Sequence, residues 1–198
     1  MPRLFVGIDA GDAVRSAVGR VLPRLRELSP RSKWVPVENL HLTVVFLGSV
    51  DEARLPLYVR ALDESVRGHA AVTLTLKGGG AFGSRGRPRV LWAGVEGAES
   101  LRGLHTDAER LFETLGHAKE TRVWSPHLTL ARARDPHGDR ELAACVPVLE
   151  EALHAGTEAG AGAGVPLPVK ELVLFQSHTG PGGARYEALH RSLLGSSP

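Results

Sequence analysis

Residues 34–44 read Trp-Val-Pro-Val-Glu-Asn-Leu-His-Leu-Thr-Val, and residues 122–130 read Arg-Val-Trp-Ser-Pro-His-Leu-Thr-Leu. Each segment contains a tryptophan, then a proline, and then His-Leu-Thr followed by an aliphatic residue. The two histidines, His41 and His127, lie in different halves of the chain, so the similarity is a weak internal repeat. The repeat predicts two similar lobes, each of which supplies one His-x-Thr strand to a shared cleft.

The segments around the repeat predict a mixture of helices and short strands. Apolar residues recur at helical spacing in residues 14–28 and 101–115. Strands are expected at residues 4–8, 41–47, 72–76 and 170–176. Because the helices and strands do not alternate strictly, the order favours an α+β fold with antiparallel sheets.

Three features are expected to interrupt these elements. Pro23 predicts a kink or an early end of the first helix, because proline lacks the amide hydrogen. The glycines at 78–80 are expected to end the strand at 72–76. The stretch at 155–164, rich in glycine and alanine, predicts a mobile surface loop.

Composition excludes several classes of protein. A chain of 198 residues is within the size of one domain, and 42% hydrophobic with 23% charged residues is typical of a soluble globular protein. The single cysteine, Cys145, excludes an intramolecular disulfide and favours the cytosol. No apolar run is long enough for a transmembrane helix, and the first residues do not resemble a secretory signal. We therefore expect a cytoplasmic protein that does not act at a membrane.

The net charge of +2 excludes a histone-like polycation. Most of the basic residues are arginines, which favour bidentate contacts with phosphate, although a GC-rich genome explains the arginine content equally well. Local groups of basic residues could still hold an anionic ligand. These groups are Arg85, Arg87 and Arg89, and Lys119, Arg122, Arg132 and Arg134 around the second repeat.

The His-x-Thr pattern suits chemistry at a phosphodiester. Side chains alternate along a strand, so the histidine and the threonine of each copy point to one face and the aliphatic residues to the other. Two copies bring together two imidazoles that titrate near neutral pH and two hydroxyl groups. One histidine can take a proton from the attacking oxygen while the other protonates the leaving oxygen, and the threonines can hold the phosphate.

Other interpretations of these residues are less economical. A single His-Leu-Thr is more typical of an ordinary strand with a structural histidine, but the flanking residues are repeated too. A zinc site needs three or four ligands, and neither segment has a cysteine or carboxylate at ligand spacing. Cys145 has the context of a buried helical residue, and no nucleophile elbow, phosphate loop or dinucleotide fingerprint is present. We therefore expect no metal and no other cofactor.

Both His-x-Thr motifs resemble those of the two-histidine phosphoesterase superfamily, and the resemblance extends to its RNA 2′,3′-cyclic phosphodiesterases, also called LigT-like proteins or 2′-5′ RNA ligases. It implies one bilobal α+β domain over residues 1–198, with two pseudo-symmetric lobes, each with an antiparallel sheet and flanking helices, around a central cleft. The matching segments are residues 3–9, 34–48, 80–83, 87–92, 126–132 and 174–177, followed by Gly180-Pro and Tyr186.

The resemblance also implies an activity and roles for four residues. The implied reaction is metal-independent hydrolysis of a terminal RNA 2′,3′-cyclic phosphate to a 2′-phosphate, with 2′-5′ ligation as its chemically allowed reverse. His41 would protonate the leaving 3′ oxygen, and His127 would activate water. Thr43 and Thr129 would bind the phosphate oxygens.

Two further residues are implied to bind substrate. Arg132 lies where the family carries a phosphate-contacting arginine, and Phe46 lies where an aromatic ring can stack on the terminal base. Strict alternation places both on the face opposite their histidines, so they can act only if the strand twists, bulges or ends there.

Two alternative functions stay open at this point. One is a non-catalytic module that binds RNA ends, and the other is a phosphodiesterase for 2′-5′ oligonucleotides or small cyclic phosphates. The expected partner is RNA with a 2′,3′-cyclic phosphate end, including tRNA halves, and the expected oligomeric state is a monomer.

Overall fold

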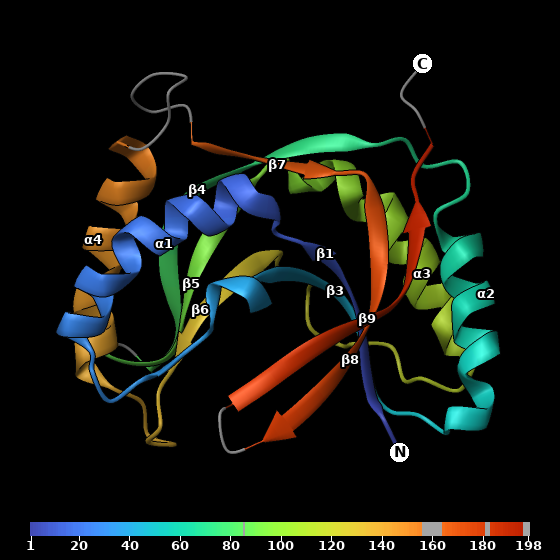
Figure 1. Ribbon diagram of the computed structural model, residues 1–198, viewed down its shortest axis with the longest axis horizontal. Helices are drawn as coiled ribbons and strands as arrows, with labels where there is room; N and C mark the ends of the chain where they lie inside the picture. The colour runs from blue at the N-terminus through green and yellow to red at the C-terminus, as the bar shows by residue number, and fades with distance from the viewer. Residues whose placement is uncertain (85, 156–163, 181–182, 196–198) are drawn as a thin grey trace.

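The computed structural model describes residues 1–84, 86–155, 164–180 and 183–195 (Figure 1). Within these residues the strands form one antiparallel sheet in the order β7-β4-β5-β6-β3-β1-β8-β9, with β2 paired to β6. The strands are β1 (Arg3–Asp9), β2 (Lys33–Trp34), β3 (His41–Ser49), β4 (Val72–Ser84), β5 (Arg87–Glu96), β6 (His127–Arg132), β7 (Val165–Val169), β8 (Glu171–Gly180) and β9 (Gly183–Leu193).

The sheet has two halves that correspond to the two expected lobes. One half contains β3, β1, β8 and β9, and the other contains β6, β5, β4 and β7. The halves meet where Leu42 of β3 pairs with Leu128 of β6, so the two His-x-Thr strands are neighbours at the centre. The predicted α+β class with antiparallel sheets is confirmed, although the two lobes share one continuous sheet.

Each half is covered by its own pair of helices. In Figure 1, α1 (Gly11–Leu28) and α4 (Arg140–Ala155) lie at the left, and α2 (Leu55–Ser65) and α3 (Arg102–Thr114) lie at the right. The left pair packs against β4, β5 and β7, and the right pair against β3, β8 and β9. Short 3₁₀ turns at η1 (Val37–Asn39), η2 (Glu52–Arg54) and η3 (Ala98–Leu101) precede β3, α2 and α3.

Of the two outcomes expected at Pro23, a kink or an early end of the helix, the early end is wrong. Helix α1 continues through Pro23 to Leu28. Pro23 is exposed, so water can bond the carbonyl that its missing N–H leaves free. Leu22 and Leu25 are buried on the other side of the helix, and this burial outweighs the lost hydrogen bond.

The expected end of a strand at glycines 78–80 is also wrong, because β4 runs through all three. A bulge lies between Leu76 and Gly79, and Gly80 pairs with Trp92 of β5. A Cβ atom at Gly80 would overlap the ring of Trp92. Gly80 therefore leaves room for the ring of Trp92 beside the strand, and the glycines do not end it.

Three further expectations concern Cys145, the loop at 155–164 and the absence of a transmembrane helix. Cys145 is buried in α4, where its Sγ lies 3.6 Å from the carbonyl oxygen of Leu25, and burial raises its pKa to about 11. This agrees with a structural role. The loop expected at 155–164 falls mostly on residues 156–163, which lie outside the described residues. In the described part of the chain, no helix has the length and hydropathy needed to cross a membrane.

Candidate active site

The four His-x-Thr side chains lie on one face at the junction of the two halves. Leu42 and Leu128 are paired and buried, so they point to the same side of the sheet. The residues on either side of each leucine must then point to the opposite side. That side carries His41, Thr43, His127 and Thr129, all partly exposed, and we call it the histidine face.

Both imidazoles are held by the same kind of hydrogen bond. Nδ1 of His41 lies 2.7 Å from the carbonyl oxygen of Asn39, and Nδ1 of His127 lies 2.7 Å from that of Ser125. A carbonyl oxygen can only accept, so Nδ1 carries the hydrogen in each ring. In the neutral ring Nε2 is then the nitrogen with a free lone pair. The sequence predicted the two histidines but not these two carbonyls, which precede each histidine by two residues.

Aromatic rings surround each imidazole. The ring centroid of His41 lies 4.7 Å from that of Phe5 and 5.0 Å from that of Tyr186, which meets it edge-on. The ring of His127 is met edge-on by Phe82, also at 5.0 Å. These contacts restrict rotation of both imidazoles and exclude water from part of their surface.

The environment lowers the pKa of both histidines. Burial is the main cause for each, and the backbone carbonyl bonded to Nδ1 opposes it. The positive charge of Arg132 lowers both pKa values further, whereas Asp9 raises the pKa of His41. One guanidinium therefore acts on both imidazoles, and one carboxylate favours the protonated form of His41.

A β-bulge brings Phe46 to the histidine face. Thr43 pairs with Gly7 of β1, but Val45 pairs with Val6, so Val44 is an extra residue in β3. After this bulge the alternation shifts by one residue. Phe46 then lies opposite Phe5, whose ring contacts His41, and Phe46 is 71% exposed. Phe46 therefore lies on the same face as His41, although strict alternation would place it on the opposite face.

The same arrangement occurs in the other half of the sheet. Thr129 pairs with Trp92 of β5, but Ala131 pairs with Leu91, so Leu130 is the extra residue in β6. Arg132 then lies opposite Val90, on the same face as Thr129. Each His-x-Thr is thus followed directly by a bulge that returns a later side chain to the histidine face.

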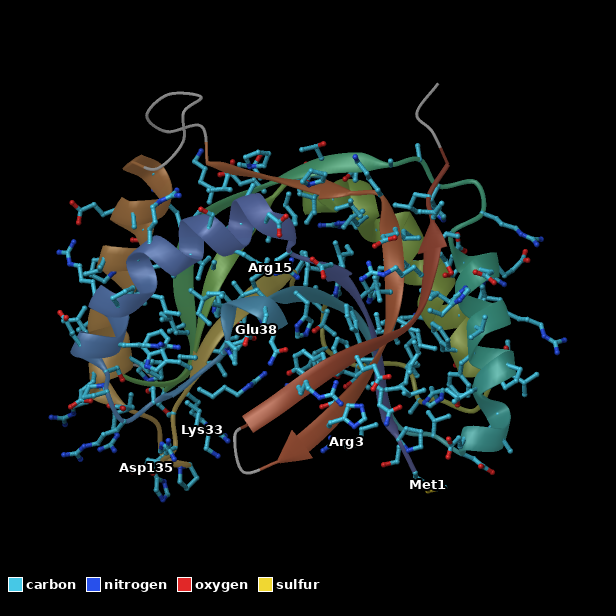
Figure 2. The ribbon with its side chains drawn as sticks, viewed as in Figure 1. Met1, Arg3, Arg15, Lys33, Glu38 and Asp135 are labelled. Atoms are coloured by element: carbon cyan, nitrogen blue, oxygen red, sulfur yellow. The ribbon has the colours of Figure 1, made fainter. Side chains whose placement is uncertain are left out.

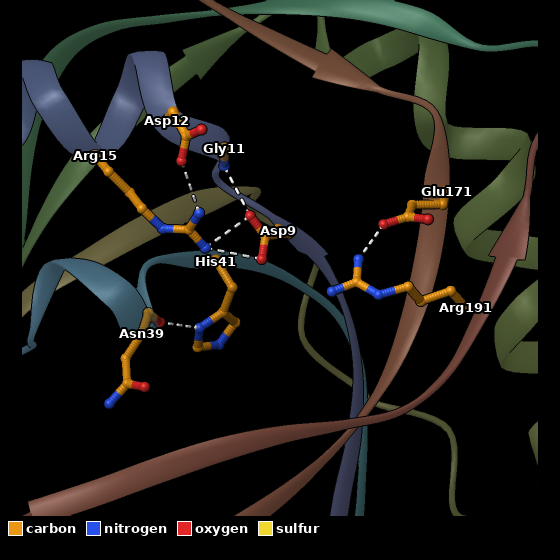
Figure 3. Close-up of polar contacts among 8 residues, drawn as sticks. All are labelled: Asp9, Gly11, Asp12, Arg15, Asn39, His41, Glu171 and Arg191. Carbon is orange, nitrogen blue, oxygen red and sulfur yellow. Dashed lines mark hydrogen bonds and ion pairs between the residues drawn. The ribbon is translucent and has the colours of Figure 1, made fainter.

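A recess of about 130 Å³ adjoins His41. Its walls include Asp9, Glu38, Tyr186 and Arg191. Figure 3 shows that Asp9 receives two 2.8 Å hydrogen bonds from Arg15, and that Arg191 contacts Glu171. The walls of the recess are therefore fixed by ion pairs made before any ligand binds.

Three aromatic residues near the histidines were not predicted to contact them. Phe5, Phe82 and Tyr186 all lie in segments that match the family, but they reach the imidazoles only because distant strands pair in a particular register. The contact of Tyr186 with His41, for example, depends on the pairing of β8 with β9. Among the described residues, no group of three or more His, Cys, Asp or Glu side chains is placed to hold a metal ion.

Comparison with known proteins identifies the family. Residues 9–92 match the family described as LigT like Phosphoesterase. A protein of Thermus thermophilus named RNA 2′,3′-cyclic phosphodiesterase is 31% identical over 199 residues, which cover 97% of this chain and 90% of that one. The chain belongs to the LigT-like phosphoesterase family. An Aeropyrum pernix protein of the same name is 38% identical over 139 residues, covering 68% of this chain and 76% of that one.

Solved structures of LigT-like proteins share the fold over nearly the whole chain. TT0787 of Thermus thermophilus has a TM-score of 0.72 and 28% identity, and covers 99% of this chain and 100% of its own. LigT of Escherichia coli, solved with 3′-AMP, has a TM-score of 0.71 and 25% identity. The match covers 98% of this chain and 99% of LigT. The resemblance to the two-histidine phosphoesterases is therefore confirmed, and this chain is an enzyme of that family.

Proposed function

We propose that this enzyme hydrolyses the 2′,3′-cyclic phosphate at the 3′ end of RNA to a 2′-phosphate, using His41 and His127 and no metal ion. The names of the relatives support the substrate. The observation that carries the mechanism is the pair of imidazoles on one face, each with Nδ1 bonded to a carbonyl and Nε2 left for the substrate. This pairing also favours catalysis over simple binding of RNA ends.

The reaction needs one neutral and one protonated histidine. Nε2 of neutral His127 takes a proton from water, whose oxygen forms a bond to phosphorus. The bond from phosphorus to O3′ breaks on the opposite side, and Nε2 of protonated His41 gives its proton to O3′. The products are a 2′-phosphate and a 3′-hydroxyl, and solvent then restores the two protonation states.

The charges around the site favour this assignment of roles. Asp9 raises the pKa of His41, and the anionic phosphate would favour its protonated form further. The hydroxyl groups of Thr43 and Thr129 and the guanidinium of Arg132 would bind the phosphate oxygens. Phe46 would stack on the terminal base.

The same proposal includes the RNA substrate, the oligomeric state, the cellular compartment and the reverse reaction. RNA with a cyclic phosphate end, including tRNA halves, is the proposed substrate, and the proposed state is a cytoplasmic monomer. The reverse reaction, formation of a 2′-5′ bond, uses the same acid and base because each step is reversible at the same site.

Identification of the product tests the proposal. The purified enzyme is incubated with 2′,3′-cyclic AMP in the presence of EDTA, and we expect 2′-AMP as the product. The variants His41→Ala and His127→Ala should each lose about 10²- to 10⁴-fold in kcat. His154→Ala is the control, because His154 is exposed on α4 and, among the described residues, bonds a carbonyl of its own helix.

Two results would contradict the proposal. One is full activity in either of the two active-site variants. The other is loss of activity in EDTA that zinc restores, which would favour metal catalysis instead.

A further inference from the structure

Four exposed basic residues lie on two neighbouring segments beside the active site. Lys33 of β2 pairs in register with Arg132 of β6. One step further out, Nε of Arg134 donates a 2.8 Å hydrogen bond to the carbonyl oxygen of Arg31. We call these residues, Arg31, Lys33, Arg132 and Arg134, the basic rim, and all four are exposed.

Lys33 and Arg132 leave the sheet on the same side, and Arg31 and Arg134, just beyond the paired residues, are exposed. Ser32, between Arg31 and Lys33, is buried, and Ala133, between the two later arginines, is partly buried. Because Arg132 lies on the histidine face, its paired neighbour Lys33 lies on that face as well. Figure 2 shows Lys33 at the lower edge of the molecule, close to the label of Asp135.

The basic rim lacks a counter-charge. In the part of the chain that the structure describes, none of the four side chains forms an ion pair, and the neighbouring Asp135 is paired with Arg87 at 3.6 Å. Like charges directly opposite each other on two strands destabilise the sheet. The charges of this placement therefore do not stabilise the sheet, and they create a local positive potential that attracts an anion.

The rim continues outward from the proposed phosphate site. Arg132 is close enough to lower the pKa of both His41 and His127. Lys33 lies on the next strand, about 5 Å away, and Arg134 follows Arg132 by two residues, beyond the end of β6. Cations therefore continue outward from the proposed phosphate site, as phosphates do along a single strand of RNA.

We propose that Arg31, Lys33 and Arg134 of the basic rim bind the phosphodiester backbone of the RNA immediately 5′ of the cyclic phosphate, which Arg132 holds. This inference rests on the proposed function and specifies its substrate further. The enzyme would then prefer an RNA chain to a cyclic mononucleotide, without regard to sequence, because the contacts are to phosphates.

The test compares two substrates in a charge-neutralised variant. Lys33→Gln/Arg134→Gln removes two rim charges and leaves Arg132 in place. We measure kcat/KM for a short oligoribonucleotide with a 2′,3′-cyclic phosphate end and for 2′,3′-cyclic AMP. The ratio of the two should fall by about tenfold or more at low salt, and the log–log salt slope for the oligonucleotide should flatten by about 1.4, or 0.7 for each lost phosphate contact.

The control variant loses the same charge elsewhere. Arg60 of α2 and Arg102 of α3 are exposed and lie on the helices at the other end of the molecule. Arg60→Gln/Arg102→Gln should leave both the ratio and the salt slope unchanged. The Tm of the double variant is measured as well, because Arg134 also bonds the carbonyl oxygen of Arg31. If this Tm falls, the single variant Lys33→Gln, which removes only an exposed side chain, repeats the comparison, and its salt slope should flatten by about 0.7.

The outcomes separate this inference from the proposed function. If the wild-type enzyme cleaves both substrates and the rim variant keeps the ratio and slope, the rim does not bind RNA. If the wild-type enzyme cleaves neither, the proposed function fails. In that case, binding of a fluorescent oligonucleotide with a 3′-phosphate still tests the rim, because equal affinity of the rim and control variants would overturn it.

Discussion

The carbonyl oxygens of Asn39 and Ser125 determine which nitrogen of His41 and of His127 would face the substrate in the proposed reaction. Each accepts a hydrogen bond from Nδ1 at 2.7 Å. The two rings therefore present the same nitrogen, Nε2, and differ mainly in their neighbours. Although burial lowers the pKa of both rings, Asp9 favours the protonated form of His41 alone, which suits the proposed role of His41 as proton donor.

At the scale of single residues, the sequence indicated which residues belong to the candidate site better than it indicated the face to which each side chain points. The placement of His41 and His127 on one face followed from alternation and from the repeat. Phe46 and Arg132 did not follow, because each lies beyond a bulge. A bulge depends on how a strand pairs with its partner, and one strand's sequence does not contain that information.

Arg132 should control the pH dependence of the reaction as well as its rate. Its charge lowers the pKa of both histidines, so Arg132→Ala should raise both pKa values and move the kcat/KM profile to higher pH. Removing this phosphate contact should also cost about 10²-fold in kcat/KM. Arg132→Lys keeps the charge and should keep the wild-type profile while losing bidentate binding. Profiles that superimpose for the alanine variant and the wild type would contradict this role.

At the scale of the elements, the tryptophan residue of each repeat contacts the His-x-Thr strand of the other repeat. Trp34 of the first repeat pairs in register with Ala131 in the strand of the second. Trp124 of the second repeat donates a 3.2 Å hydrogen bond from Nε1 to the carbonyl oxygen of Thr43 in the strand of the first. The backbone of Trp34 thus pairs with the strand of the second repeat while its indole bonds the carbonyl oxygen of Ser29, and the indole of Trp124 holds the strand of the first repeat close to its bulge.

Helix α1 and strand β4 both continue past residues that predict a break, and for the same physical reason. Pro23 and the glycines at 78–80 are local signals for a break, and in both places packing overrides the signal. Burial of one face of α1 outweighs the hydrogen bond lost at Pro23, and the ring of Trp92 needs the space above Gly80. Such contacts come from residues distant in the chain, so the local sequence could not reveal them.

The variant Gly80→Ala should destabilise the protein by about 1–3 kcal/mol, because its Cβ would force the ring of Trp92 to move. Denaturant unfolding measures the change. Gly19→Ala is the matched control, since a Cβ at this helical position meets nothing within 4 Å and should stabilise α1 by about 0.5–1 kcal/mol. Equal stability of Gly80→Ala and the wild type would show that Trp92 does not depend on this glycine.

At the scale of the whole molecule, the repeat predicted the two lobes and their meeting point. It did not predict that the lobes share one continuous sheet, because Leu42 and Leu128 carry no signal beyond being apolar. The shared sheet fixes the two histidines in one rigid frame. The active site is therefore formed by the junction itself and not by the closing of two independent domains.

The stability of the molecule should fall as the pH falls through the histidine range. Burial lowers the pKa of four histidines: His41, His105, His117 and His127. Below about pH 6.5 the unfolded chain binds protons that the folded protein does not. The stabilising contribution of these histidines to the free energy of unfolding is therefore complete above about pH 6.5 and is lost as the pH falls below it. Tm measured from about pH 8 to about pH 5 should decrease steadily. A Tm that rises over this interval would contradict the assigned direction.

The pH dependence of kcat/KM in the wild type and the two histidine variants tests the central claim most directly, namely that two imidazoles act on one phosphorus atom. The wild-type profile should be bell-shaped, with its optimum below about pH 6.5 because both pKa values are lowered in the free enzyme. In the residual activity, His127→Ala should lose the acidic limb and His41→Ala the basic limb. A variant that keeps both limbs, at any level of activity, would contradict the claim that its histidine transfers a proton.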